Sequence, residues 1–343
     1  MSHPQQNRTL LAGLSTALLL AAASTSAAAG DNFFEGKTIK IIVAGSTGGA
    51  YDIPARAAAR YLPKYIPGKP TVIVQNMPAA GGMVGINHVY NVSAKDGTEI
   101  GVFNRNTILA PLAGIKEAKF DIDKFNWLGT PASYKDDAQV FMIRSSLPQK
   151  TVADLRAPGE PLNIGNTGTA ITDILPKALG LNIKVIRGYT SNKLNMALEQ
   201  GEVDGRTLAY ANVVGIYPHW IKDGLVRFMI VFGHEKRFPP LPDVPTAREL
   251  ARDPQERALV ALVEAPLSLG TPFALPPGVP PERVEVLRKA FMSTMNDPEY
   301  KAEIANAKME YSPRSGAEIQ DDMARLAQTP EDVLKIYRAS VGF

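Results

Sequence analysis

Short apolar runs alternate with helix-like segments along most of the chain. Residues 38–44 form a strand-like run, and a glycine-rich loop separates it from a helix predicted over 53–62. Strands are predicted again at 72–74 and 99–103, on either side of a helix that begins at Met83. Because strand, loop and helix recur at this spacing, we expect right-handed βαβ units, a parallel sheet and an α/β fold.

A second set of elements begins after Gly129, which indicates a second lobe. A helix expected after residue 169 is interrupted by Pro176, and Gly201 is expected to cap another helix at its C-terminus. The other predicted strands and helices of this lobe are 139–143, 151–155, 162–164, 183–187, 192–199 and 226–232.

The rest of the chain is expected to cross between the lobes. Residues 238–246 are rich in proline and predict an extended crossover, and residues 265–274 predict a return to the first sheet. An amphipathic helix over 282–295 and a helical tail over 317–339 complete the pattern. These boundaries divide the mature chain into two discontinuous lobes, 30–130 with 250–315 and 131–249 with 316–343.

Residues 1–29 form a predicted signal peptide. Arg8 supplies positive charge, an apolar stretch covers 10–23, and the alanines at 27–29 fit a small-residue cleavage site. The apolar stretch is too short for a comfortable membrane span, which needs roughly 18 residues. We therefore expect an exported protein that reaches the periplasm.

Composition excludes several classes of protein. The chain has no cysteine, which rules out thiol catalysis, iron–sulfur clusters and cysteine-based zinc sites. Its histidines, His3, His88, His219 and His234, are not at zinc-ligand spacing, so no metal site is expected. The formal net charge of +3 comes from scattered lysines and arginines, which argues against nucleic acid as a partner. We find no cofactor signature and no nucleophile–base set, so no catalytic residue is predicted.

Two glycine-rich loops have similar sequences: GSTGGAYD at residues 45–52, here called glycine loop 1, and GNTGTAITD at residues 165–173, glycine loop 2. Each follows a strand and precedes a helix, so its backbone N–H groups and the helix dipole can hold an anion. A plain tight turn would use the same residues. The candidate ligand-binding residues are Thr47, Gly48 and Gly49 in the first loop and Asn166, Thr167, Gly168 and Thr169 in the second.

Asp52 ends glycine loop 1 and has two compatible interpretations. It suits the N-cap of the following helix, and it could accept a hydrogen bond from a ligand hydroxyl, amine or bridging water. Ala80 and Gly81 belong to a run of small residues that would either let a ligand approach the backbone or allow close helix–sheet packing.

Polar and aromatic side chains at strand ends are further candidates. Asn104 and Arg105 follow the third predicted strand, and ligands of open α/β sheets sit outside such strand ends. Arg105 could pair with a distal carboxylate or simply be solvated, and Arg187 and Arg206 have the same two interpretations. Tyr189 could stack on a ligand or lie half-buried at a lobe edge.

Several segments follow one another in a characteristic order and spacing. They are 41–43 with 48–52, 72–82, 96–98, 165–169, 201–204, 241–246 and 276–280. Together they resemble the periplasmic solute-binding proteins of the tripartite tricarboxylate transporter family, also called Bug receptors. The resemblance implies a two-lobed fold like that of periplasmic binding proteins, each lobe a mostly parallel sheet flanked by helices, with the ligand in the cleft between them. It also implies that residues 47–52 and 166–169 hold a carboxylate.

Three segments near the expected pocket depart from the family pattern. Thr172 and Asp173 stand where members often have a histidine, and residues 187–191 replace a usual VPYKG run. Residues 205–207 do not have the sequence of the apolar strand often seen there. The ligand of a better-known relative is therefore not carried over to this chain.

The resemblance implies a receptor that captures a small carboxylate by hinge closure and delivers it to the small and large subunits of a membrane permease. The expected ligand is a mono- or dicarboxylate, and an aromatic one fits Tyr51, Tyr189 and Phe103 near the cleft. Two alternatives stay open. One is an exported hydrolase or isomerase with Asp52 or Asp173 as its base, and the other is a ligand-sensing receptor for a membrane kinase.

Overall fold

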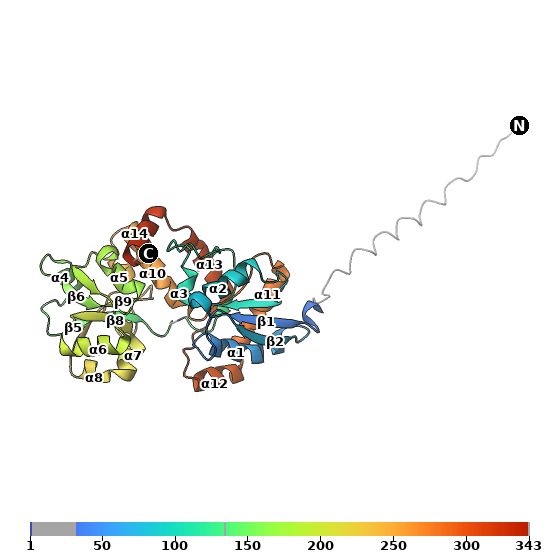
Figure 1. Ribbon diagram of the computed structural model, residues 1–343, viewed down its shortest axis with the longest axis horizontal. Helices are drawn as coiled ribbons and strands as arrows, with labels where there is room; N and C mark the ends of the chain where they lie inside the picture. The colour runs from blue at the N-terminus through green and yellow to red at the C-terminus, as the bar shows by residue number, and fades with distance from the viewer. Residues whose placement is uncertain (2–31, 134, 342–343) are drawn as a thin grey trace.

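The computed structural model describes residue 1, residues 32–133 and residues 135–341 of the chain. Two lobes stand side by side in Figure 1, each built on one β-sheet. The predicted signal peptide, apart from its first residue, lies outside the described residues. Within these ranges, none of the helices is both long and apolar enough to cross a membrane.

The first lobe contains a six-stranded sheet. Its strand order is β11 (Arg314–Ser315), β4 (Asn126–Thr130), β10 (Phe273–Leu275), β3 (Glu99–Val102), β1 (Thr38–Val43) and β2 (Thr71–Asn76). β1 pairs in parallel with β2 and β3, as the predicted βαβ units require. β10 and β11 pair antiparallel with their neighbours.

The second lobe contains a five-stranded sheet. Its strand order is β7 (Ile183–Ile186), β6 (Leu162–Gly165), β8 (Gly205–Ala209), β5 (Gln139–Arg144) and β9 (Val226–Phe232). β6 is parallel to β7 and β8, whereas β5 is antiparallel to β8 and β9. Both sheets are therefore mixed rather than mostly parallel. β5 and β10 enter their sheets after a crossover from the other lobe, so no βαβ unit fixes their direction.

Residues 205–207, whose sequence does not suggest an apolar strand, begin the central strand β8. The hydroxyls of Thr207 and Thr172 lie 2.6 Å apart on one face of this strand. On the other face, Arg206 donates to the carbonyl of Ser191 at 3.4 Å and to the side chain of Asn195. The strand tolerates these buried polar residues because other side chains and backbone groups satisfy them.

Helices cover both faces of the two sheets. Those with the first sheet are α1 (Asp52–Tyr61), α2 (Met83–Asn91), α3 (Arg105–Ile108), α11 (Pro281–Asn296), α12 (Pro298–Asn306) and α13 (Gly316–Ala327), with 3₁₀ turns η1 (Asn32–Phe34), η2 (Leu62–Tyr65) and η3 (Ala79–Gly82). Those with the second sheet are α4 (Val152–Arg156), α5 (Ala170–Ala178), α6 (Ser191–Gln200), α7 (Tyr210–Ile216), α8 (Pro218–Lys222), α9 (Ala247–Leu250), α10 (Pro254–Glu264) and α14 (Glu331–Val341). The 3₁₀ helix η4 (Ala265–Leu269) leads from α10 back to β10.

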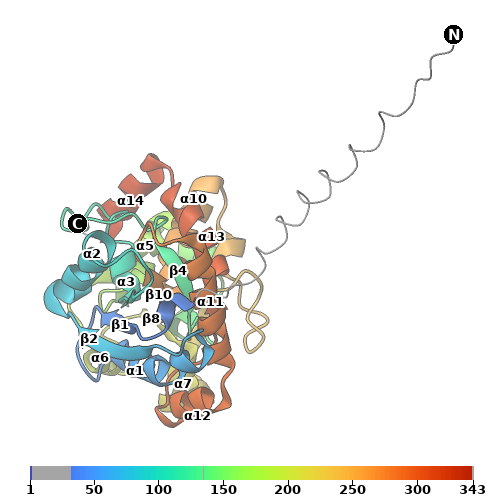
Figure 2. The ribbon, with the colours of Figure 1, turned by 90° about the vertical axis from the view of Figure 1, so that its right-hand side faces the viewer.

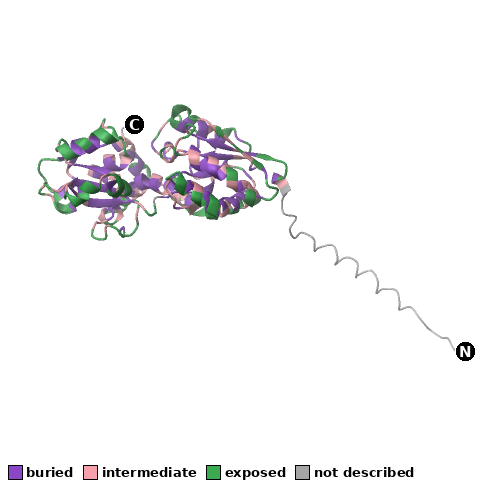
Figure 3. Ribbon diagram, turned by 90° about the horizontal axis from the view of Figure 1, so that it is seen from below, coloured by how far each residue is buried: buried purple, intermediate pink, exposed green. Residues whose placement is uncertain are grey.

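The two faces of β1 belong to different parts of the core. Ile42 joins a buried cluster with Ile86 of α2, whereas Ile41 joins a cluster with Leu287 of α11. Figure 2 accordingly shows α2 and α11 on opposite sides of the strands. Buried segments fill the inside of both lobes in Figure 3. The apolar side chains along one face of α11, such as Leu287 and Phe291, are buried. The period of apolar residues thus predicted this helix and its buried face correctly.

The C-terminal third of the chain passes repeatedly between the lobes. Residues 238–246 do not cross, contrary to expectation, because Thr246 forms a bridge with Val231 of β9 and Phe238 is buried in the second-lobe core. The predicted helical tail is two helices. The first, α13, packs on β4 of the first sheet, and the second, α14, packs on α5 together with α10. The junction is therefore a packed region in which α10, η4, α13 and α14 meet (Figure 1).

Candidate functional site

Three loops of the first lobe meet at the carboxyl ends of β1, β2 and β3. The hydroxyl of Tyr51, in glycine loop 1, donates to Oδ1 of Asn104 at 3.0 Å. The hydroxyl of Thr107, in α3, lies 3.3 Å from the carbonyl of Gly81, to which it donates. Ala80 and Gly81 both have positive φ, 51° and 63°, and both are exposed. Hydrogen bonds therefore join these three loops, with the residues predicted from them, at one edge of the first sheet.

The buried side chain of Asp52 holds glycine loop 1 in place by hydrogen bonds. It is 1% exposed, and its Oδ2 accepts hydrogen bonds from the N–H of Gly48 and from Nε of Arg56, each at 2.7 Å. Its Oδ1 accepts from Nδ2 of Asn76 at 2.9 Å. Burial alone would raise the pKa of Asp52, but the hydrogen bonds from Arg56, Gly48 and Asn76 outweigh it and hold the pKa below its ordinary value.

The predicted N-cap role of Asp52 is wrong. Tyr51 occupies the N-cap position and Asp52 is the first residue of α1, with its side chain directed back to the loop. The amides of the loop are used internally, because the N–H of Gly49 donates to the carbonyl of Ser46 at 3.1 Å. The first N–H groups of α1, from Asp52 and Ile53, donate to the carbonyl of Gly49 at 2.9 and 3.1 Å. In this conformation the N–H groups of Gly48 and Gly49, both predicted ligand contacts, are occupied within the loop.

Glycine loop 2 is held by hydrogen bonds to Asn166, a residue that comes before Gly168 in the loop rather than after it. Asn166 is 1% exposed, and its Oδ1 accepts from the N–H groups of Gly168 at 3.0 Å and Thr169 at 2.8 Å. Its Nδ2 donates to the carbonyl of Thr169 and to the carboxylate of Asp173. Gly168 has a φ of +92°, a conformation that favours glycine.

The first turn of α5 is left open by this arrangement. Thr169 is the N-cap residue, and its side chain makes no capping hydrogen bond. Its hydroxyl instead lies 2.9 Å from the hydroxyl of Thr172. The N–H groups of Ala170 and Ile171 have no partner within the helix, because the first amides of any α-helix lack one. They mark the positive end of the helix dipole.

A cavity of about 300 Å³ lies where α5 faces the first lobe. Gly168, Thr169 and Ala170 line it from the second lobe, and Arg105 lines it from α3 of the first lobe. The structure thus brings together predicted residues that are more than 60 positions apart in the sequence. The remaining lining residues are Asn106, Leu109, Gln139, Ile171, Asp173, Val263, Pro266, Leu267, Tyr337 and Val341.

Comparison with known proteins now gives the family. The family model described as tripartite tricarboxylate transporter family receptor matches residues 55–334. The chain belongs to this family. Its members are extracytoplasmic solute receptors, so the resemblance deduced from the sequence motifs is confirmed.

Individual relatives of the receptor are distant. The "UPF0065 protein in gbd 5'region" of Cupriavidus necator is 27% identical over 304 residues, which cover 86% of this chain and 85% of that protein. A TctC solute-binding protein from Polaromonas, solved without ligand, has a TM-score of 0.67 at 22% identity and covers 89% of this chain and 98% of its own. MatC from Rhodopseudomonas palustris, solved with bound malate, has a TM-score of 0.50 at 20% identity, with 87% and 99% covered. These structures confirm the two-lobed fold.

Other predicted residues of the receptor lie outside the 300 Å³ cavity. Arg187 pairs with Asp173, with its Nη2 2.9 Å from Oδ1, and thereby braces glycine loop 2. Arg206 is buried inside the second lobe, where desolvation lowers its pKa to about 10. Tyr189 packs half-buried against the second-lobe core. Phe103 is fully buried against Phe125, so it gives no support for an aromatic ligand.

Most of the candidate ligand-binding residues do not belong to the lining of the 300 Å³ cavity. Of the thirteen proposed ligand contacts, the cavity lining includes Arg105, Gly168 and Thr169 and leaves out Thr47, Gly48, Gly49, Asp52, Ala80, Gly81, Asn104, Asn166, Thr167 and Tyr189. Sequence reasoning missed its third wall, formed by α10, η4 and α14 of the receptor. The pattern predicted a helical tail, but no local signal shows that this tail returns to the ligand cleft.

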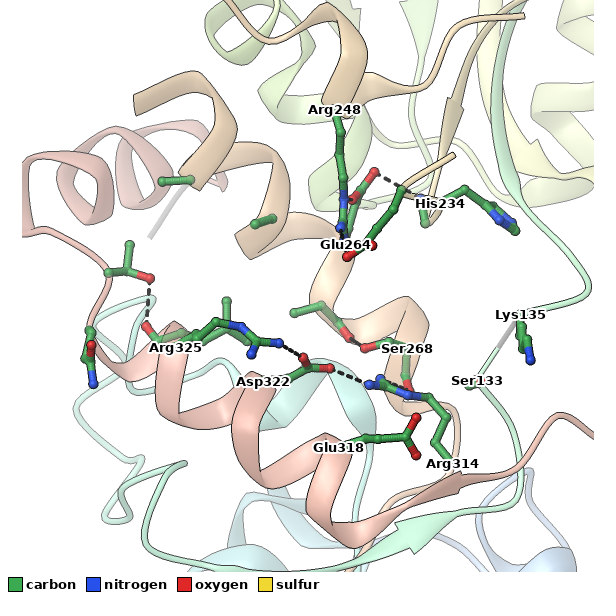
Figure 4. A pocket seen from close by; sticks show the side chains of 18 of the residues that line it. Ser133, Lys135, His234, Arg248, Glu264, Ser268, Arg314, Glu318, Asp322 and Arg325 are labelled. Atoms are coloured by element: carbon green, nitrogen blue, oxygen red, sulfur yellow. Dashed lines mark hydrogen bonds and ion pairs between the residues drawn. The ribbon is translucent and has the colours of Figure 1, made fainter. Parts of the chain in front are cut away.

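A larger cavity of about 950 Å³ lies at the junction of the lobes (Figure 4). Its charged side chains bind one another: Nε of Arg248 lies 2.7 Å from Oε2 of Glu264, and Nη2 of Arg314 lies 2.8 Å from Oδ2 of Asp322. Burial raises the pKa of Glu264, although Arg248 partly opposes this effect. None of the candidate ligand-binding residues lines this cavity, and its three arginines, Arg248, Arg314 and Arg325, already have acidic partners. The smaller cavity, which three of the candidate residues line, is therefore the candidate ligand site.

Proposed function

We propose that this receptor captures a small carboxylate in the 300 Å³ cavity between its lobes and delivers it to a membrane permease. One observation carries the proposal. Arg105 of the first lobe and the uncapped first turn of α5 in the second lobe line the same cavity. A helix N-terminus and a guanidinium group both favour a carboxylate, and they bind it from opposite walls.

The charges around the cavity support an anionic ligand. Asp173 also lines it, but Arg187 donates to its Oδ1 from Nε at 3.0 Å and offsets its charge. The remaining charged side chain of the lining is the cation Arg105. MatC, a family relative of the same fold, was solved with malate, which is itself a carboxylate.

The geometry does not favour the alternative of an exported hydrolase or isomerase. A general base needs a free lone pair and a pKa near the working pH. Asp52 does not meet the second requirement, because its pKa is lowered, and three hydrogen bonds already occupy most of its lone-pair sites. Asp173 is held by Arg187 and Asn166. A sensing receptor for a membrane kinase would use the same cavity, so its partner alone would distinguish it.

Delivery requires that the permease distinguish the loaded receptor from the empty one. We propose that the lobes rotate at the junction so that glycine loop 1, with the exposed Thr47, closes over the carboxylate. A carboxylate bound by both lobes would stabilise the closed state. A small and a large permease subunit would then recognise that state in the periplasm.

The first test is a thermal-shift screen of the mature protein, unfolded and refolded to remove any carried ligand. A ligand that binds only the folded state raises the melting temperature. We expect a subset of carboxylates to do so, and Arg105→Gln to weaken the best of them by about 30-fold through loss of a charge-assisted bond. The matched control is Arg60→Gln, which removes an exposed arginine paired with Glu303 far from the cavity. Shifts by neutral or cationic solutes alone, or equal affinity of the two variants, would contradict the proposal.

A further inference from the structure

The side chain of Tyr337 is buried, and its hydroxyl has no partner among the described residues. Tyr337 lies on α14, is 6% exposed and lines the 300 Å³ cavity. Its hydroxyl makes no hydrogen bond to any residue in the described part of the chain. Burial raises its pKa to about 12, so the hydroxyl carries its proton at neutral pH and can donate it. Because this hydroxyl is not among the fully enclosed polar atoms and Tyr337 lines the cavity, an atom in the cavity can accept its hydrogen bond.

α14 is held in place from both lobes around Tyr337. Nε of Arg338 donates to the carbonyl of Leu112, in the first lobe, at 3.0 Å. Nη2 of Arg187, in the second lobe, donates to the carbonyl of Ser340 at 2.9 Å. Because these contacts flank Tyr337 in sequence, the helix backbone that carries it is fixed relative to the cavity.

The walls near Tyr337 are apolar. Val263, Pro266 and Leu267 from α10 and η4, with Val341 from α14, line the cavity beside it. A cavity of roughly 150 Å³ can hold benzene. A cavity of about 300 Å³ therefore has room for one ring with polar substituents at its two ends.

We propose that the ligand is a small ring-bearing carboxylate whose far end carries an oxygen that accepts a hydrogen bond from Tyr337, which makes Tyr337 a specificity-determining residue. This inference rests on the proposed function: the carboxylate meets α5 and Arg105, and the ring lies along the apolar wall. A second carboxylate at the far end would lack a counter-charge, because Arg105 is the one cation among the described lining residues.

The test compares ring acids with and without a far oxygen by calorimetric titration of the refolded protein. The probes are benzoate, 3-hydroxybenzoate, 4-hydroxybenzoate and adipate. We expect one hydroxybenzoate to bind about fivefold more tightly than benzoate, the value of one neutral hydrogen bond. Tyr337→Phe should bring its affinity to within about twofold of benzoate and leave the affinity for benzoate unchanged.

Tyr300→Phe is the matched control. Tyr300 is fully buried in the first lobe, its hydroxyl also has no partner among the described residues, and it lines neither cavity. This variant should keep the hydroxybenzoate preference. The inference is overturned if Tyr337→Phe keeps the preference or weakens benzoate equally. Tighter binding of adipate than of every ring acid would overturn it and leave the proposed function intact. No binding of any of the ring acids would also overturn it, whereas the proposed function is tested separately by the carboxylate screen.

Discussion

The two glycine loops have similar sequences and the same place between strand and helix, but they are braced in opposite ways. In glycine loop 1 the brace is Asp52, which follows the glycines and accepts the N–H of Gly48. In glycine loop 2 the brace is Asn166, which precedes them and accepts the N–H groups of Gly168 and Thr169. Loop 1 closes over the start of α1, whereas loop 2 leaves the start of α5 facing the cavity.

This difference shows what the composition of a glycine loop leaves undetermined. Glycine and threonine make an anion site available, but the position of one polar residue decides which amides a ligand can reach. The brace of loop 1 is also charged and paired with Arg56, whereas that of loop 2 is neutral. The loops should therefore respond differently to substitution and to pH.

The largest expected effect is on stability when the braces are removed. Asp52→Ala should lower the free energy of unfolding by about 3 kcal/mol, because Arg56, Asn76 and the Gly48 amide lose a buried charged acceptor. Asn166→Ala should cost about 2 kcal/mol, because its backbone partners lose a neutral one. Urea unfolding measures both. Asp321→Ala, at an exposed position, should change stability by less than about 0.5 kcal/mol. A larger cost at Asn166 would contradict the assignment of the stronger brace to loop 1.

The glycines at positive φ offer a matched pair of substitutions. A Cβ added at Gly48 or Gly168 would meet no atom within 4 Å, so alanine at either position should cost only the backbone strain, about 1–2 kcal/mol. Ligand affinity should separate them. Gly168→Ala places a methyl group in the cavity lining and should weaken carboxylate binding more than Gly48→Ala, which lies outside the lining. Unfolding curves and calorimetric titrations of the two variants check this, and equal losses of affinity would remove the distinction between the loops.

The smallest expected effect is the response to acid. The pKa of Asp52 is lowered on folding, so its contribution to stability is complete above its ordinary value of 3.8 and is lost as the pH falls through the lower folded value. The Asn166 brace does not titrate. Hydrogen exchange followed by NMR at about pH 6 and about pH 2.5 should show that the Gly48 amide loses protection relative to the Gly168 amide. Parallel loss at both amides would show that Asp52 is not the local acid-sensitive group.

Much of the fold could be predicted because local patterns determine it. Strand β9 has the predicted bounds, since its residues are almost all apolar, and the C-cap glycine Gly201 has the predicted left-handed φ of 79°. Pro176 does not interrupt α5, which runs through it because tertiary packing overrides local propensity. Helix α10 was missed although its N-cap Asp253 and Pro254 at the first helical position are local start signals. The polar strand β8 was missed because partners elsewhere in the chain, such as Thr172 for Thr207, stabilise it.

The site was less predictable than the fold. The sequence indicated the glycine loops, Asn104 and Arg105, and the structure places these at facing strand and helix ends. In loop 1 the Gly48 amide is occupied by Asp52, whose other oxygen accepts a hydrogen bond from Asn76 on strand β2. Tyr337 lies 159 residues after the end of α5 at Ala178 (337 minus 178) and reaches the cavity only because the last helix returns to the junction. Such long-range contacts leave no period or motif in a single sequence.

The most direct test of the proposed ligand site is a crystal structure of the mature receptor with the tightest-binding carboxylate from the screen. We predict carboxylate oxygens within hydrogen-bond distance of the Ala170 and Ile171 amides and of the Arg105 guanidinium group. This prediction is contradicted if the carboxylate binds the amides of glycine loop 1 alone, or if the ligand occupies the junction cavity beside Arg248 and Glu264.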